Sequence, residues 1–166
     1  DLRIDEQRAT LIASGALDFS GKTQNALKFA INHRAPAIKA SGSLSGTPKK
    51  LTFNAALDAP NVMTVSGELI DALSPQMRWN ATVAATDLAF AQYGIEAPVQ
   101  TVSAGLSGSG SLRSVNLRGS LGLDQDVFDV RDLDIEMLDA NTLKINALKL
   151  GLPGDGVFSA KGVWPL

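Results

Sequence analysis

The sequence lacks cysteine, holds a single histidine and contains few aromatic residues. The absence of cysteine excludes disulfide scaffolds, thiol catalysis and cysteine-ligated zinc. With His33 as the only imidazole, most histidine-based metal sites and catalytic triads are excluded as well. Phe, Trp and Tyr make up 5% of the residues, whereas glycine alone occurs 15 times. This excess of small residues over large rings is the feature of the composition that needs a structural explanation.

A strong net charge and long hydrophobic runs are also missing. Fifteen basic residues face seventeen acidic ones, and the largest basic cluster is the Lys49-Lys50 pair. The electrostatic footprint of a nucleic-acid-binding protein is therefore absent. No segment approaches the ~18 consecutive apolar residues of a membrane-spanning helix. The chain starts at Asp1 without a signal-peptide pattern, so we expect residues 1–166 to be one segment of a larger protein, with any membrane anchor outside it.

Alternation of apolar and polar residues dominates what is present. The 166 residues are 45% hydrophobic, enough for one domain with a sizeable core. Period-two alternation predicts strands with one apolar face, and it is clearest where Leu51, Phe53 and Leu57 alternate with polar residues. About eleven strands are predicted, at residues 11–19, 27–31, 38–44, 50–58, 63–69, 77–85, 102–106, 115–123, 133–137, 143–147 and 158–164. Short connectors rich in Gly, Pro and Asn favour antiparallel neighbours.

A Gly-x-Leu repeat organises these strands. It occurs in residues 13–17, 40–44 and 65–69, each time followed by a polar turn and a second alternating strand. The repeating unit is thus a hairpin, and stacked hairpins predict an all-β fold built as an extended, mainly antiparallel sheet. An ordinary β-sandwich with a coincidental Gly-x-Leu pattern is the alternative.

Two places depart from regular alternation. Residues 86–93 predict a turn or two of helix, with Thr86 or Asp87 as the N-cap and Gly94 at its end. The apolar parity shifts from Ala147 to Leu148, which predicts a β-bulge.

Short motifs of known chemistry do not support an enzyme. Residues 20–23 imitate the end of a phosphate-binding loop, but Ala16 stands where that loop needs glycine. His33 has no evident nucleophile, no Ser stands in Gly-x-Ser-x-Gly, and residues 108–111 lack the third glycine of a dinucleotide-binding fingerprint. No catalytic residue, metal site or cofactor is therefore predicted.

Acidic residues gather between positions 124 and 139, where seven carboxylates accompany Arg131 alone. Calcium binding is conceivable because carboxylates are its ligands, but the order of an EF-hand loop is absent. The alternation instead predicts a strand with a polar and an apolar face. Its polar face holds Asp132, Asp134 and Glu136, and its apolar face holds Leu133, Ile135 and Met137.

Two segments resemble a known family of bacterial proteins. Residues 66–90, SGELIDALSPQMRWNATVAATDLAF, resemble the recurring unit of the TamB family: a Gly-x-Leu strand, a Pro-containing turn, a Trp-initiated strand and an Ala-x-Asp-Leu exit. Residues 132–164 resemble units of the wider AsmA-like superfamily, in which a Leu-rich strand, a Leu-Pro-Gly turn and a Ser-Ala-x-Gly strand recur. Residues 94–112 depart from this pattern because they are unusually small and Ser-rich.

The resemblance implies a fold and a task. Members of this superfamily are anchored in the inner membrane of Gram-negative bacteria and cross the periplasm as U-shaped β-grooves with an apolar lining. They are thought to conduct phospholipids toward the outer membrane, and TamB partners the barrel protein TamA in outer-membrane protein assembly. The resemblance thus implies a non-enzymatic periplasmic segment that contacts phospholipid acyl chains, with the TamA-type partner and the membrane anchor engaged by other parts of the chain.

The apolar residues of the alternating strands are the candidate lining of such a groove. Small residues between them would let the sheet curve and leave room beside larger side chains. The predicted lining residues are Leu17, Phe19, Leu27, Phe29, Ile31, Leu51, Phe53, Leu57, Met63, Val65, Leu69, Met77, Trp79 and Val83.

Two other functional classes remain open on the sequence. A β-sandwich or β-solenoid binding module of a bacterial surface protein would have a closed core and no continuous apolar channel. A β-scaffold enzyme such as a polysaccharide lyase would need a cleft with clustered acids, bases and aromatic residues, which the scarcity of Tyr, Trp and His disfavours.

Overall fold

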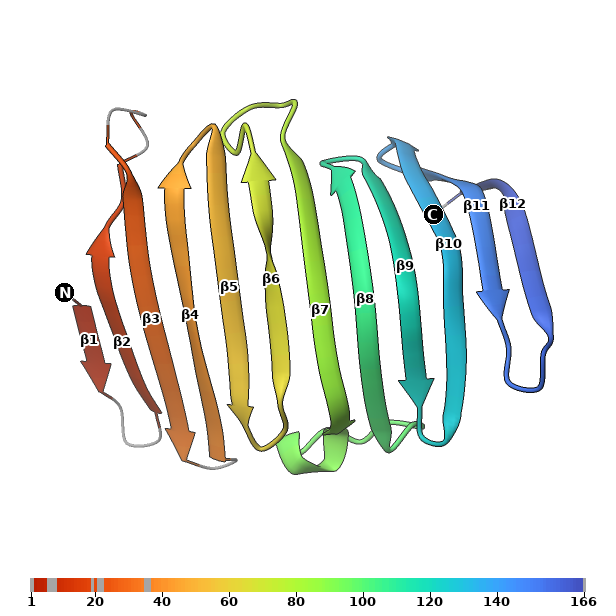
Figure 1. Cartoon of the computed structure of the whole chain (residues 1–166), viewed down its shortest axis with the longest axis horizontal. Coiled ribbons are helices and arrows are strands. Elements are labelled where there is room, and N and C mark those ends of the chain that lie inside the picture. The colour runs from red at the N-terminus through yellow and green to blue at the C-terminus, as the bar shows by residue number, and fades with distance from the viewer. Residues whose placement is uncertain (1, 6–8, 19, 21–22, 35–36, 166) are drawn as a thin grey trace.

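The computed structural model is one open, curved, antiparallel sheet of twelve strands (Figure 1). The structure describes residues 2–5, 9–18, 20, 23–34 and 37–165. Each strand pairs with the strand before it and the strand after it in the chain, so the order in the sheet equals the order in the sequence. The first and last strands form the two edges. The predicted all-β sheet of successive hairpins is confirmed.

Eleven of the strands correspond to the predicted segments. The remaining strand, β1, carries one short Leu-x-Ile alternation and has no counterpart in the predicted set. The strands are β1 (Leu2–Asp5), β2 (Ala9–Ala16), β3 (Asn25–Arg34), β4 (Ala37–Thr47), β5 (Lys50–Ala59), β6 (Met63–Ile70), β7 (Arg78–Ala89), β8 (Thr101–Ser111), β9 (Ser114–Leu123), β10 (Asp126–Asp139), β11 (Thr142–Gly151) and β12 (Val157–Pro165).

Glycine is required where neighbouring backbones come close together. A Cβ atom added to Gly15, whose φ is 132°, would lie 1.9 Å from the carbonyl oxygen of Ala26. A Cβ atom added to Gly67 would lie 2.1 Å from the carbonyl oxygen of Asn80. Both glycines belong to the Gly-x-Leu repeat, so the repeat marks positions at which the adjacent strand leaves no room for a side chain.

The segment after β7 is helical for one turn only. Residues Phe90–Tyr93 form a 3₁₀ helix, η1, and Gly94 ends it in the left-handed conformation with φ 72°. The predicted end is confirmed, but the predicted N-cap is wrong. Residues 86–89 continue β7, where the backbone N–H of Asp87 donates to Ser103 Oγ at 3.0 Å, and the residue before η1 is Ala89.

Register shifts mark β-bulges along the sheet. The β11–β12 pairing shifts between Ile145 and Leu148, which confirms the predicted bulge. A second bulge, not predicted, lies in β10 between Val130 and Leu133. Each inserts one extra residue and thereby returns the next large apolar residue to the same face.

The sheet forms a single layer, and this corrects the expectation of a sizeable core. Among the described residues, Leu51 and Val130 are the only buried large apolar side chains, 4% and 7% exposed. The accessible surface is 10755 Å², against about 7,900 Å² for a compact protein of this mass. The β-sandwich alternative is therefore wrong for the described part of the chain, since no second layer covers the sheet there.

Candidate functional site: the apolar face of the sheet

One face of the sheet consists of four apolar rows, each made of residues that face one another across adjacent strands. The first row crosses all twelve strands: Leu2, Ala13, Phe29, Gly42, Ala55, Val65, Val83, Leu106, Gly119, Val130, Leu150 and Phe158. The second contains Gly15, Leu27, Leu44, Phe53, Gly67, Ala81, Gly108, Leu117, Leu133, Leu148 and Ala160. We call the four rows together the apolar face.

Two further rows flank these. The third contains Gly46, Leu51, Leu69, Trp79, Gly110, Val115, Ile135, Ile145 and Gly162. The fourth contains Ile4, Leu11, Ile31, Ala40, Leu57, Met63, Ala85, Ala104, Leu121 and Phe128. None of the residues in the four rows is polar or charged. Two polar residues of β3 border the rows on the same face: buried Asn25, paired with Gly46, and His33, paired with Ile38.

The structure brings most of the predicted lining residues together. Eleven of the fourteen lie on this face: Leu27, Phe29, Ile31, Leu51, Phe53, Leu57, Met63, Val65, Leu69, Trp79 and Val83. Leu17 and Met77 adjoin strands without belonging to them, and Phe19 lies outside the described residues. That these side chains contact lipid remains a prediction.

The predicted set omits the second half of the face. Leu106, Leu117, Leu133 and Leu148 continue the same rows across β8 to β11. Their alternation is visible in the sequence. The same alternation continues beyond Val83, so the pattern alone is sufficient to include them.

Glycines make the apolar face flatter, because large side chains can lie over them. An added Cβ atom at Gly42 would lie 2.5 Å from Phe29 Cζ, and one at Gly67 would lie 2.8 Å from Phe53 Cζ. Large rings therefore lie across the glycines of the neighbouring strand instead of projecting from the sheet. This arrangement explains the composition: each small residue leaves room for one of the few large ones.

Trp79 is held on this face by a hydrogen bond as well as by packing. Its Nε1 donates a hydrogen bond to the carbonyl oxygen of Ser111 at 3.2 Å. Its ring reaches over β8, where an added Cβ atom at Gly110 would lie 2.9 Å from Cζ2. The hydrogen bond satisfies the only polar atom of the indole, so the ring presents apolar surface to whatever contacts this face.

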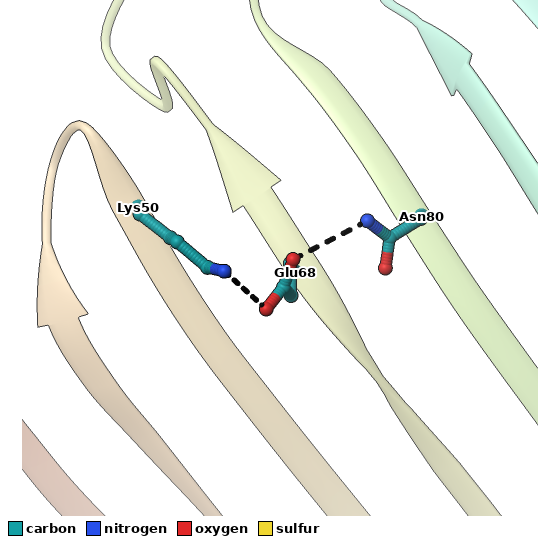
Figure 2. A network of polar contacts seen from close by, with 3 residues as sticks. All are labelled: Lys50, Glu68 and Asn80. Carbon is teal, nitrogen blue, oxygen red and sulfur yellow. Dashed lines mark hydrogen bonds and ion pairs between the residues drawn. The ribbon is translucent and has the colours of Figure 1, made fainter.

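The opposite face is polar and exposed. Figure 2 shows a contact network across three of its strands: Lys50 Nζ lies 2.8 Å from Glu68 Oε1, and Asn80 Nδ2 donates to Glu68 Oε2 at 3.5 Å. These contacts lower the pKa of Glu68; the hydrogen bond from Lys50 has the largest effect, and the one from Asn80 the next largest. Hydroxyl residues such as Ser43, Ser66 and Thr82 occupy the same face. The two faces of this sheet thus differ strongly in polarity, although Ile12 and Ala30 lie on the polar face and Asn25 on the apolar one.

Asp132 and Asp134 of the acidic segment lie on this polar face. Asp132 lies 3.5 Å from Arg118 Nη2 and opposite Lys149, and Asn146 Nδ2 donates to Asp134 Oδ1 at 3.4 Å. The predicted division of the strand into a polar and an apolar side is what the register shows. Within the described part of the chain, no group of three or more His, Asp or Glu side chains is arranged to hold a metal ion.

A hollow of about 630 Å³ lies beside η1, at one end of the strands. It is lined mainly by Phe90, Ile95, Val99 and small residues of the connection to β8, with Glu96 as the charged group. His33 lies elsewhere, near the end of β3. His33 is therefore not among the residues that line the hollow.

The arrangement defines a single-layer sheet with one continuous apolar face. No family model, curated protein or solved structure matches the chain. None of the helices in the described residues has the length and apolar character needed to cross a membrane.

Proposed function

We propose that this chain is a non-enzymatic segment that shields phospholipid acyl chains on its apolar face and conducts them between membranes. The first apolar row carries the proposal, because it crosses all twelve strands without a polar residue. The resemblance of residues 66–90 and 132–164 to TamB and AsmA-like units supports the same function. In this proposal the chain works in the periplasm of a Gram-negative bacterium, as part of an inner-membrane-anchored protein.

The energetics of moving a lipid favour such a surface. Each methylene group exposed to water costs ~0.8 kcal/mol, hence on the order of 10 kcal/mol for a long acyl chain. A continuous apolar face removes most of this barrier. Residues of similar polarity along each row leave no single deep well in which a chain would be trapped, so acyl chains can move along the face.

The partners follow from the proposed task. Lipids move toward the outer membrane, and the chain supports outer-membrane biogenesis and protein assembly through a TamA-type barrel that other parts of the protein engage. Phospholipid acyl chains are the ligands of the apolar face, and neither a cofactor nor a nucleic acid takes part.

Site-specific photo-crosslinking tests the proposal. A photoreactive phenylalanine analogue is placed at Phe53 or Trp79 on the apolar face, and at the matched positions Asn54 or Asn80 on the polar face. The purified chain is then mixed with vesicles of phosphatidylethanolamine and phosphatidylglycerol that carry labelled acyl chains. We expect several-fold more labelled lipid at Phe53 and Trp79; equal capture on both faces would overturn the proposal.

A charge introduced on the apolar face tests the proposal in cells. Phe53→Glu places a carboxylate on the second apolar row and should impair outer-membrane integrity while the protein stays folded and expressed. Asn54→Glu, one residue away on the polar face, is the matched control and should leave the membrane intact. Loss of the Phe53→Glu protein itself would instead indicate that Phe53 serves packing alone.

A further inference from the structure

The apolar face is too large to remain in contact with water. Twelve strands spaced about 4.8 Å apart, with about eight residues each rising about 3.3 Å, give a face of about 1,400 Å². Contiguous apolar patches on soluble monomers rarely exceed a few hundred Å². The excess of accessible surface over that of a compact protein points the same way. Some occupant must therefore cover this face whenever lipid is absent.

The size of the face fits a second copy of the chain. Two such faces in contact would bury about 2,800 Å² in total, within the range of about 2,000–5,000 Å² found for obligate homodimers. Sheets pack face to face about 10 Å apart through interleaved apolar side chains. The low relief produced by glycines such as Gly42 and Gly67 permits this approach, and the four rows offer no charged group that a second copy would leave unpaired.

We propose that two lipid-free copies pair through their apolar faces about a two-fold axis near the middle of the sheet, and that acyl chains compete with the second copy for this face. The pairing depends only on the area and chemistry of the face, whereas the competition rests on the proposed function. A two-fold contact uses the same surface on both copies and closes on itself. Contacts through the edge strands β1 and β12 would instead produce open arrays.

The competition would determine whether the apolar face is covered by lipid or by a second copy. A ligand that binds only the single copy shifts the equilibrium away from the pair, and the pair reciprocally weakens the apparent affinity for the ligand. Empty apolar faces would therefore stay covered until lipid arrives, which protects the chain from nonspecific aggregation.

The absence of native cysteine makes the pairing directly testable. Val83 lies in the first row on β7, near the middle of the sheet, and Thr82 points to the opposite face. In a two-fold pair, residues near the axis lie close to their own copies. Facing backbones about 10 Å apart are too distant for a direct disulfide, so a short bismaleimide links the thiols. We expect it to join Val83→Cys into a covalent dimer several-fold more efficiently than Thr82→Cys, and the unaltered chain to sediment at twice its 17.4-kDa mass. Val65→Cys and Ser66→Cys provide a second matched pair should Val83→Cys fail to fold.

Oleate below its micelle concentration supplies the competing acyl chain. We expect it to reduce cross-linking of Val83→Cys several-fold while circular dichroism shows an intact sheet. A chain that stays monomeric, or one in which Thr82→Cys cross-links as efficiently as Val83→Cys, overturns the pairing and leaves the proposed function standing. A dimer whose cross-linking oleate does not reduce overturns the competition. The proposed function itself fails only if the photoreactive probes on the apolar face also capture no excess lipid.

Discussion

The strands β2 to β7 and the strands β9 to β12 build the same apolar face in different ways. The five pairings from β2 to β7 contain one register shift, between Lys39 and Ala40. The three pairings from β9 to β12 contain five. In the first region alternation keeps the large residues on one side, with a single irregularity near the end of β5. In the second, the alternation breaks and bulges restore it.

Two bulge residues perform this restoration. Arg131 is the extra residue of β10 relative to both β9 and β11, and Asn146 is the extra residue of β11 relative to both β10 and β12. Val130 and Leu133 therefore share a face although they are three positions apart, as do Ile145 and Leu148. The comparison shows that the apolar face is maintained over the whole sheet even where the sequence pattern slips by one residue.

Single-residue deletions should separate the two regions most sharply. Deleting Asn54 in β5 would turn Leu57 to the polar face and Asp58 to the apolar face, so we expect the sheet to be lost. Deleting Arg131 leaves Val130, Asp132 and Leu133 in plain alternation with partners already in register, so we expect a folded protein. Far-ultraviolet circular dichroism and urea unfolding measure the difference. Equal loss of structure in both variants would contradict the role assigned to the bulge.

Glycine replacements should differ between the regions by a smaller amount. An added Cβ atom at Gly67 on β6 would lie 2.1 Å from a backbone oxygen, whereas one at Gly122 on β9 would lie 3.2 Å from Ser103 Cβ. We expect Gly67→Ala to lower the free energy of unfolding by about 3 kcal/mol and Gly122→Ala to change it by no more than about 1 kcal/mol. Urea unfolding of both variants provides the measurement, and a larger loss for Gly122→Ala would refute the assignment.

Asp18, in the connection between β2 and β3, should give the first region a pH dependence of its own. Hydrogen bonds from the Ser20 and Thr23 hydroxyls and from the Ser20 backbone amide lower its pKa to about 2. Because the folded pKa lies below the unfolded value, this stabilisation is complete above pH 3.8 and is lost as the pH falls toward 2.

Comparison with Asp18→Asn isolates this contribution. The unaltered chain should lose unfolding free energy through that acidic window more steeply than the variant, as followed by urea unfolding at successive pH values. Parallel curves for the two proteins would show that the carboxylate does not stabilise this connection.

Substitutions on the polar face should change the stability of the sheet least of all. Lys50 and Glu68 form an exposed ion pair (Figure 2), and exposed pairs contribute little to stability. We expect Lys50→Ala to leave the urea midpoint unchanged within error while the pKa of Glu68 rises toward its usual value, since the largest cause of its lowering is removed. Carboxyl titration by NMR measures the second effect; a clear drop in the midpoint would mean that the polar face contributes more than its exposure suggests.

Particular residues show which structural features can be predicted from the sequence. The alternation of Leu51, Phe53 and Leu57 predicted both the strand and its apolar side, and the parity change at Leu148 predicted a bulge. The equivalent change between Val130 and Leu133 carried the same signal for the bulge at Arg131. Gly67 could not be interpreted in this way, because the carbonyl oxygen that requires glycine there comes from Asn80 on another strand.

The sequence by itself determined the period of the strands, their hairpin order and the side on which each residue lies, because these follow from local alternation and short turns. It left open whether the apolar side would be covered, because a sandwich and a single layer share the same alternation. The tertiary structure decided this by pairing every strand only with its neighbours in the chain, so that the described residues form one layer whose apolar rows align across it. Alternation determines which residues share the apolar face. Only long-range packing determines whether another layer covers that face.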